Sequence, residues 1–287
     1  MPIWQAVVLG VVQGLTEFLP ISSTAHLLLV QEWWFGRSRE ELKVDPFTVV
    51  IQLGTLLAVV VYFRRDILAM LRAFTADIAK GYWITSTSTE SRLAKLIIVG
   101  SVPAGLAGLF LKKWLKEQFY NPVPIAIVAI VFALLMFAAE WWAKRRVGRG
   151  SEQITLTDAL FVGSFQALAL MPGGSRSGCT ITAGLFAGLA RPAAARFSFL
   201  LSIPIMAAAG AKELYDWLKL LREKPELQAD AQNQMVALAV GTGVSFVVGY
   251  FAIAWLLRYL ARSSMNVFVV YRIILGVGIL LAVALNR

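Results

Sequence analysis

The sequence predicts an all-α integral membrane protein, and three observations support this class. Hydrophobic residues make up 58% of the 287 residues and charged residues only 15%, and the mean hydropathy of +0.70 lies far above that of soluble domains. Several apolar stretches reach the roughly 20 residues that a helix needs to cross a hydrocarbon core of about 30 Å. The alternation typical of membrane barrels is missing, so the backbone hydrogen bonds must be closed within helices.

Six stretches are predicted to span the bilayer: residues 47–63, 93–114, 121–143, 193–212, 234–260 and 267–285. Four further apolar segments are too short or too interrupted to span, and they form two pairs, 2–18 with 22–34 and 155–171 with 176–190. Each pair is broken by a turn, FLPISS around Pro20 and LMPGGS around Pro172. Broken helices persist at membrane depth only where they line a cavity inside the protein, so both pairs are predicted to be re-entrant.

The two breaks belong to a short internal repeat. VQGLTEFLPISS aligns with FQALALMPGGS across a gap of one residue, which pairs Gln13 with Gln166, Leu15 with Leu168, Pro20 with Pro172 and Ser23 with Ser175. Each pair of segments is followed by a span that begins near a proline, Pro46 or Pro192. Three spans separate the two units, an odd number, so the second unit must enter from the opposite face. The sequence therefore predicts an inverted-topology repeat.

The chain is predicted to be a single polytopic membrane domain over residues 1–287. Its parts, in chain order, are repeat unit one at about 1–63, a linking hairpin at about 93–143, repeat unit two at about 155–212 and C-terminal spans at about 234–285. Lys and Arg are most concentrated in the loops of residues 64–92 and 144–149. The positive-inside rule places these loops in the cytoplasm and both termini outside it.

The net charge of +10 and the nine Trp residues would suggest a nucleic-acid partner in a soluble protein. Here basic and Trp residues flank the predicted spans, where they meet anionic headgroups and the membrane interface. We therefore expect the membrane, and no nucleic acid, as a partner. The single cysteine, Cys179, cannot form an intramolecular disulfide.

The ionisable and polar side chains inside the apolar segments gather at the two breaks. Such groups are costly within a bilayer and are functional candidates by default. The first break holds Gln13, Glu17, Ser22, Ser23, Thr24 and His26, the only histidine. Gln13 and Glu17 are four residues apart and share one helix face. A new helix is expected to start with Ser22 or Ser23 as its N-cap, which places His26 one turn further along the same face.

The second break repeats this design. Gly173 and Gly174 permit a close approach of the backbone, and Ser175 or Ser177 can cap the helix that carries Thr180. Two helix N-termini that point into one cavity would form an anion site through their free N–H groups and dipoles.

The guanidinium of Arg176 adds a fork of donors suited to phosphate, so a phosphorylated group is the predicted ligand. Glu17 would repel that ligand unless it is protonated, binds a cation or acts as a base. Each residue also has a structural interpretation: His26 bonded to a carbonyl, Glu17 and Gln13 in helix packing, and Arg176 extended to the interface. Their clustering favours function. We interpret three other charged residues near span ends as interfacial: Lys95, Glu140 and Arg272.

QGLTEFLPISSTAH and PGGSRSGCT resemble the two signature motifs of the bacterial undecaprenyl-pyrophosphate phosphatases, the BacA/UppP family. The first motif, Glu or Gln followed by three residues and Glu, is met by Gln13 and Glu17. The second, Pro-Gly-any-Ser-Arg-Ser-any-any-Thr, is met throughout 172–180. The resemblance extends over the whole chain in length and span order. It implies hydrolysis of undecaprenyl pyrophosphate to undecaprenyl phosphate and phosphate, which recycles the lipid carrier of cell-wall synthesis and underlies bacitracin resistance.

The resemblance also implies a setting and a set of site residues. The setting is the bacterial inner (plasma) membrane, with the site open to the periplasmic or extracellular side, a polyprenyl pyrophosphate lipid as partner and a homodimer as a further assembly to consider. The implied catalytic residues are Glu17, Ser23, His26 and Arg176. The implied residues around the phosphates are Gln13, Ser22, Thr24, Gly173, Gly174, Ser175, Ser177 and Thr180. A divalent cation, Mg²⁺ or Ca²⁺, is implied as cofactor, with Glu17 and, less favourably, Gln13 as ligands.

Several mechanisms fit these residues. Ser23 could attack the terminal phosphorus while His26 or Glu17 takes its proton, His26 could be the nucleophile with Ser23 as a donor, or water could attack directly. A transporter or flippase of a polyprenyl phosphate is the alternative from another class, because inverted repeats and broken helices also serve alternating access. A base beside the serines favours hydrolysis, since a carrier needs only donors. A lipid-binding scaffold is the third interpretation.

Overall fold

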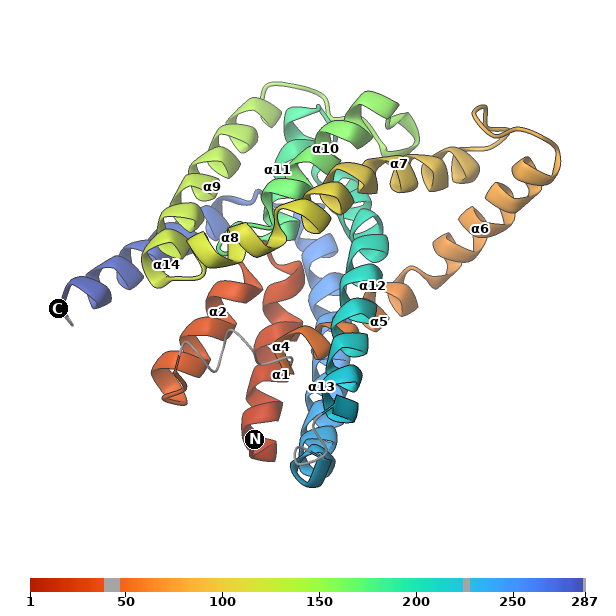
Figure 1. Cartoon of the computed structure of the whole chain (residues 1–287). Coiled ribbons are helices and arrows are strands. Elements are labelled where there is room, and N and C mark those ends of the chain that lie inside the picture. The colour runs from red at the N-terminus through yellow and green to blue at the C-terminus, as the bar shows by residue number, and fades with distance from the viewer. Residues whose placement is uncertain (39–46, 224–227, 286–287) are drawn as a thin grey trace.

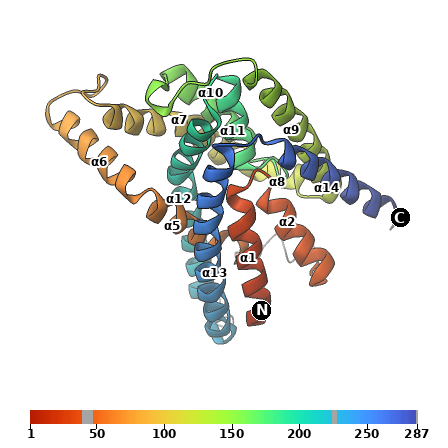
Figure 2. The ribbon, with the colours of Figure 1, turned by 180° about the vertical axis from the view of Figure 1, so that it is seen from behind.

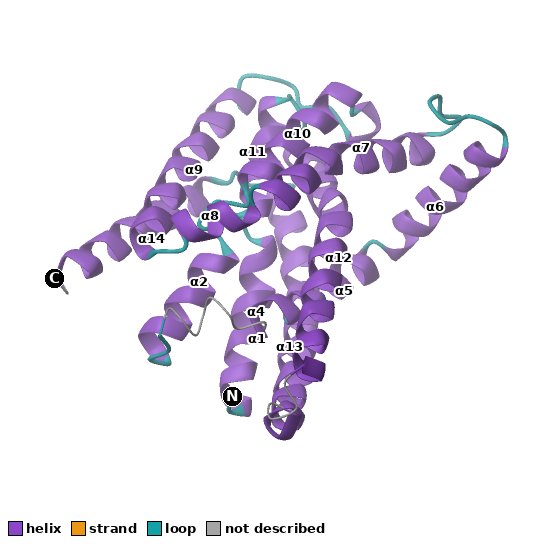
Figure 3. Ribbon diagram, viewed as in Figure 1, coloured by secondary structure: helices purple, strands orange, loops and turns teal. Residues whose placement is uncertain are grey.

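The computed structural model describes residues 1–38, 47–223 and 228–285, and these residues form an assembly of helices without a named strand (Figures 1 and 3). Pro46, the predicted start of one span, lies outside them. In the described part, five helices are long and apolar enough to cross a membrane. They are α7 (Thr89–Phe110), α9 (Pro122–Ala143), α14 (Asn266–Leu285) and the apolar parts of α12 (Arg191–Glu223) and α13 (Gln228–Leu260). The prediction of a multi-spanning helical membrane protein is thereby confirmed.

The sixth predicted span, residues 47–63, is not one continuous helix. It is divided into α4 (Phe47–Val50) and α5 (Gln52–Tyr62), and α6 (Arg64–Ala79) follows directly after Phe63. With 11 residues, α5 is about 16 Å long, short of a hydrocarbon core of about 30 Å. The sequence does not signal the division, because no proline interrupts this apolar stretch.

Both predicted breaks are present. The first separates α1 (Ile3–Phe18) from α2 (Ser23–Leu29), which continues as a π-helical turn, Val30–Trp34; the second separates α10 (Leu156–Leu168) from α11 (Arg176–Phe186). Figures 1 and 2 show α1 and α2 in the lower half of the molecule and α10 and α11 in the upper half. The remaining elements, α8 (Lys112–Phe119) and a 3₁₀ turn at Ser151–Gln153, lie in the connections that follow α7 and α9.

Each broken pair is seated on a long helix through a glycine. A Cβ atom added to Gly10 on α1 would lie 2.6 Å from the carbonyl oxygen of Gly241 on α13. A Cβ atom added to Gly163 on α10 would overlap the carbonyl oxygen of Gly100 on α7. Gly10 and Gly163 stand three residues before Gln13 and Gln166, so they are equivalent in the sequence repeat. Small residues of this kind let membrane helices approach closely, and here they allow α1 to pack against α13 and α10 against α7.

Glu140 is buried, which corrects its interpretation as an interfacial residue. Its side chain is 1% exposed and accepts hydrogen bonds from Arg191 (Nη2 to Oε2, 2.6 Å) and from the backbone N–H of Met265 (2.8 Å). These bonds tie the C-terminal end of α9 to the start of α12 and to the α13–α14 connection. Charge near a predicted span end does not separate an interfacial residue from a buried ion pair, because only the packing of other elements decides it.

Candidate functional site

The first break is shaped by Ser22, which adopts a positive φ of 74°. Its hydroxyl oxygen accepts a hydrogen bond from the backbone N–H of Ala25 (3.4 Å), so Ser22 rather than Ser23 is the N-cap of α2. A positive φ is unfavourable for a residue with a Cβ atom, and such conformations are concentrated at functional sites. Because Ser22 provides the cap, the hydroxyl of Ser23 is available for a different hydrogen bond.

The second break has the same local geometry. Ser175 adopts a φ of 67° and caps α11 by accepting a hydrogen bond from the N–H of Gly178 (3.2 Å). Gly173 has a φ of 96°, and a Cβ atom there would lie 2.5 Å from the carbonyl oxygen of Ile125 on α9. Gly173 is therefore required both for the turn and for the close backbone approach that the sequence predicted.

The cap geometry corrects the alignment of the two repeats by one residue. Ser22, not Ser23, is the structural equivalent of Ser175, because both are N-caps at positive φ. The residue after each cap is therefore Ser23 in one break and Arg176 in the other. The sequence alignment paired Pro20 with Pro172 and so needed a gap of one residue before them. In the structure, the loop from the proline to the capping serine is one residue longer in the second break.

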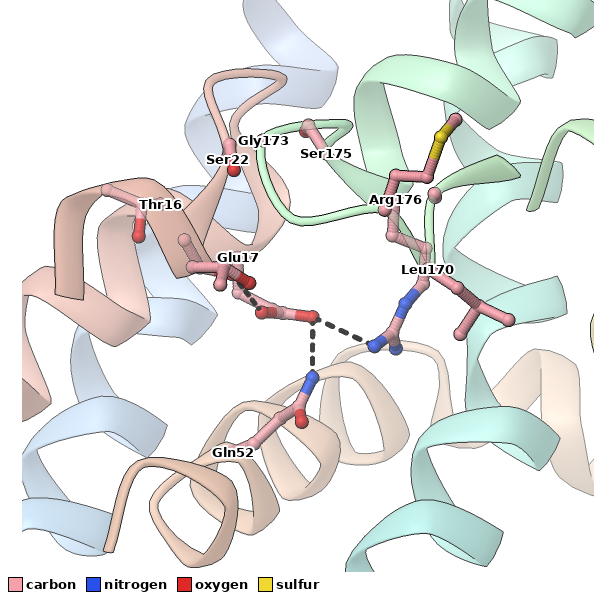
Figure 4. A pocket seen from close by; sticks show the side chains of 12 residues that line it. Thr16, Glu17, Ser22, Gln52, Leu170, Gly173, Ser175 and Arg176 are labelled. Carbon is pink, nitrogen blue, oxygen red and sulfur yellow. Dashed lines mark hydrogen bonds and ion pairs between the residues drawn. The ribbon is translucent and has the colours of Figure 1, made fainter. Parts of the chain in front are cut away.

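A polar cavity of about 180 Å³ lies where the two breaks meet (Figure 4). Most of the residues that the sequence singled out line it: Glu17, Ser22, Ser23, Thr24, Gly173, Ser175 and Arg176. The rest of the lining comes from Thr16, Gln52, Ala169, Leu170 and Met171. Segments about 150 residues apart in the chain thus line one pocket, as expected for two breaks that face a common cavity.

Four side chains interact with the carboxylate of Glu17, which lines the cavity. Its Oε2 atom accepts hydrogen bonds from the hydroxyl of Ser23 (2.8 Å) and from Nε2 of Gln13 (3.0 Å). Its Oε1 atom accepts one from Nε2 of Gln52 (3.0 Å) and lies 3.7 Å from Nη2 of Arg176 (Figure 4). Ser23 and Arg176, from different breaks, therefore reach the two oxygens of one carboxylate.

Arg176 has donor capacity that the protein does not use. Its Nη2 atom faces Glu17, while its buried Nη1 atom has no hydrogen-bond partner within the part of the chain that the structure describes. An unpaired buried guanidinium donor is costly. It is therefore suited to receive a phosphate oxygen, for which the planar fork has the matching geometry.

Two predicted site residues support the cavity from outside its wall. Gln13 donates to Glu17 and also to the hydroxyl of Thr55 on α5 (3.4 Å). His26 faces α14: its Nδ1 atom lies 2.7 Å from the carbonyl oxygen of Ser22 and its Nε2 atom 2.6 Å from the hydroxyl of Tyr271. The structure thus pairs Ser23 with Glu17 and not with His26, and a catalytic role of His26 stays a prediction.

The other predicted residues that do not line the cavity bond to the framework. Ser177 donates to the carbonyl oxygen of Leu19 (3.1 Å), which joins α11 to the first break. The hydroxyl of Thr180 lies 2.5 Å from that of Ser198 on α12, and the carbonyl of Gly174 accepts from Arg272 (3.1 Å). Direct contacts of these three residues with phosphate stay predictions.

Two residues of this region were not identified from the sequence. Gln52 donates to Glu17, and the signal was its position as an isolated amide in the predicted span 47–63. Arg272, interpreted as interfacial, is 0% exposed and bonds to both breaks. Its position six residues into an apolar stretch was a usable signal, because an interfacial arginine is expected within the first turn.

The fold and the cavity define a class: a polytopic helical membrane protein with a polar, hydroxyl-rich pocket that holds a Glu–Arg pair where two broken helix pairs meet. Comparison with known proteins narrows this class. Residues 6–278 match the model of the bacitracin resistance protein BacA family, and the chain belongs to this family.

Several curated relatives that cover nearly the whole chain are named undecaprenyl-diphosphatase. The Myxococcus xanthus protein is 45% identical over 98% of this chain and 89% of its own length. The Chlorobium limicola protein is 42% identical over 99% of this chain and 98% of its own, and the Thermomicrobium roseum protein is 45% identical over the full length of both.

Proposed function

We propose that this chain hydrolyses undecaprenyl diphosphate to undecaprenyl phosphate and inorganic phosphate, which returns the lipid carrier to cell-wall synthesis. The names of its relatives support the reaction. The observation that carries the assignment is the 2.8 Å hydrogen bond from the Ser23 hydroxyl to Glu17, in a cavity that also contains Arg176. A hydroxyl bonded to a carboxylate beside an anion clamp is the arrangement that phosphoryl transfer through a covalent intermediate needs.

In the proposed reaction, the Oγ atom of Ser23 forms a bond to the terminal phosphorus and its proton passes to Oε2 of Glu17. The bond from that phosphorus to the bridging oxygen breaks, and its electron pair leaves with undecaprenyl phosphate. Water then attacks the phosphoserine, the bond to Oγ breaks, and inorganic phosphate leaves. Both protons of the water leave with the phosphate, and Glu17 returns its proton to Oγ of Ser23, which restores the starting state.

Arg176 is the proposed clamp for the transferring group. Its unpaired Nη1 atom can bind a phosphate oxygen while its Nη2 atom stays near Glu17. The N-terminal amides of α11, which Arg176 itself begins, add partial positive charge on the same side. Charge that develops on the phosphoryl oxygens would be stabilised by donors already in place.

A divalent cation fits this site if the substrate completes its coordination. Among the described residues no group of three or more His, Cys, Asp or Glu side chains could hold a metal ion alone. Mg²⁺ is commonly bound by one or two carboxylates together with substrate phosphates, and Glu17 offers such a carboxylate at the cavity wall. We propose Glu17 as the protein ligand, with the amide of Gln13 as a further candidate. A bound cation would neutralise charge on the diphosphate.

The finer architecture is also part of the proposal. Two re-entrant pairs in an inverted repeat are supported by the equivalent caps of Ser22 and Ser175 and by the equivalent glycine seats of Gly10 and Gly163. We propose that α4 and α5 together make the sixth crossing. With the basic loops at 64–92 and 144–149 in the cytoplasm of a bacterial inner membrane, the cavity would open to the periplasmic or extracellular side.

Phosphate release by the purified protein in detergent tests the proposal. The wild type should release inorganic phosphate from undecaprenyl diphosphate, whereas a carrier without hydrolase activity would release none. Ser23→Ala should abolish release, and Ser164→Ala is the matched control, because Ser164 is exposed on α10 and bonds only to the carbonyl of Leu160.

The same preparation tests the nucleophile. A phosphoenzyme trapped by acid quenching should carry its label on Ser23. A label on His26 would support the alternative nucleophile, and a chain without label during turnover would indicate direct attack by water.

A further inference from the structure

Arg272 of α14 joins the two breaks through one guanidinium. Its Nη1 atom donates to the carbonyl oxygen of Pro20 in the first break (3.2 Å). Its Nη2 atom donates to the carbonyls of Gly173 (2.9 Å) and Gly174 (3.1 Å) in the second, and its Nε atom to that of Ala129 on α9 (3.2 Å). The side chain is 0% exposed and does not line the cavity. Within the described residues, its side-chain hydrogen bonds all go to backbone carbonyls.

These carbonyls explain how the buried guanidinium of Arg272 is stabilised. Pro20 follows the C-terminal end of α1, and Gly173 and Gly174 follow that of α10. A buried guanidinium is stable only when acceptors surround it, and these carbonyl oxygens of the two turns provide them. Arg272 therefore binds backbone carbonyls of both breaks, whereas the hydroxyl of Ser23 and the guanidinium of Arg176 face the cavity.

We propose that Arg272 is a positioning residue of the phosphatase site. It fixes the first break, which carries Ser23, against the second, which carries Arg176. Only a planar fork with several donors reaches three separate segments of backbone at once, so lysine cannot replace it. The inference rests on the proposed function, because its consequence is measured as turnover of the lipid diphosphate.

A neighbouring glycine supports this assignment. A Cβ atom added to Gly178, in the first turn of α11, would lie 3.1 Å from Nη1 of Arg272 and 3.1 Å from Oγ of Ser175. That contact is tighter than ordinary van der Waals contact, so Gly178 provides the space in which the guanidinium lies. Gly178→Ala keeps the arginine side chain and displaces its guanidinium, so this substitution is a second probe of the same role.

The test is a double-mutant cycle on the full-length protein in detergent, with undecaprenyl diphosphate as substrate. We expect Arg272→Lys to lower kcat on the order of 10- to 100-fold, as a misplacement of about 1 Å does, with KM changed by less than about twofold. The same substitution in an Arg176→Lys background should have a much smaller effect, because the clamp it positions is already impaired. Gly178→Ala should also lower kcat and should be non-additive with Arg272→Lys.

Arg191→Lys is the matched control, since it weakens the ion pair of Arg191 with the buried Glu140, outside the cavity wall. It should lower the thermal midpoint and leave kcat unchanged. Multiplicative effects of Arg272→Lys and Arg176→Lys, or a normal kcat in both Arg272→Lys and Gly178→Ala, would overturn the inference. If Arg272→Lys does not fold, the Gly178→Ala and Arg176→Lys cycle decides by the same criterion. A wild type that releases no phosphate would instead overturn the proposed function.

Discussion

The two breaks share a backbone geometry and carry different chemistry. In each, a serine at positive φ caps the following helix by accepting a hydrogen bond from the N–H three residues later. One residue after the cap, the first break has Ser23 and the second has Arg176. Four residues after it, the first has His26 and the second has Cys179, which is buried. The shared cap geometry thus places the proposed nucleophile, Ser23, and the proposed anion clamp, Arg176, at equivalent positions of one cavity.

The segments before the breaks differ in the same way. Gln13 and Gln166 are equivalent in the sequence repeat, and both are 2% exposed. Gln13 donates to Glu17, whereas both side-chain polar atoms of Gln166 lack a partner among the described residues, and Leu170 stands where the repeat would place a second carboxylate. The comparison shows that the carboxylate and its amide donor occur at the first break only, whereas the matching positions of the second break hold a leucine and a glutamine without a partner among the described residues. In the proposed mechanism, the first break alone therefore supplies the base.

The largest expected effect is the loss of the single base. Glu17→Gln keeps the shape of the side chain and removes the proton acceptor of Ser23, so kcat should fall about 10²- to 10⁴-fold, the contribution typical of a general base. Leu170→Gln makes the equivalent site polar and should change kcat far less. Initial rates of phosphate release compare the two. Equal losses would mean that the repeats do not divide the chemistry as described.

Arg176→Lys tests the proposed anion clamp of the second break. Lysine keeps the positive charge and loses the planar fork, so we expect kcat to fall on the order of 10-fold or more. Arg196→Lys is the control, because Arg196 pairs with Asp66 at a half-exposed position outside the cavity wall. Near-normal turnover of Arg176→Lys would show that charge alone is needed and would remove the fork from the mechanism.

Local signals explain what the sequence predicted correctly. Hydrophobic length identified five spans, and Pro20, Pro172 and the glycines identified both breaks. The gathering of polar residues at the breaks predicted most of the cavity wall, because few polar groups are tolerated within a membrane unless they meet. These features depend on residues close together in the chain.

Packing explains what the sequence missed. The burial of Arg272 and Glu140 depends on carbonyls and N–H groups from distant segments, which no local pattern encodes. The division of residues 47–63 brings the amide of Gln52 to the start of α5, where it reaches Glu17. The error of one residue in the repeat alignment arose because a sequence gap was placed by residue identity, whereas the cap geometry is what the two breaks share.

The two glutamines should respond oppositely to the same substitution. Gln166→Leu removes a buried amide without a partner, which costs about 1–3 kcal/mol in stability, so its thermal midpoint should rise and kcat should stay unchanged. Gln13→Leu removes a donor to Glu17 and Thr55, so its thermal midpoint and kcat should both fall, kcat by about 5- to 30-fold if one to two kcal/mol of orientation is lost. Thermal unfolding in detergent and phosphate release measure both. A fall in stability for Gln166→Leu would show that its amide has an unrecognised role.

The smallest expected effect concerns the two caps, and it tests their equivalence most directly. Ser22→Gly and Ser175→Gly both relieve a positive φ, a gain of about 1 kcal/mol, and lose a side-chain cap, which glycine replaces at a cost of only a few tenths. Both variants should therefore raise the thermal midpoint slightly and to a similar extent, because the two serines have the same conformation and the same bond. Ser164→Gly, at a helical position with normal φ, is the control and should lower it. A rise in one break and a fall in the other would mean that the serines differ in what they hold, and the common scaffold would then be limited to the backbone trace.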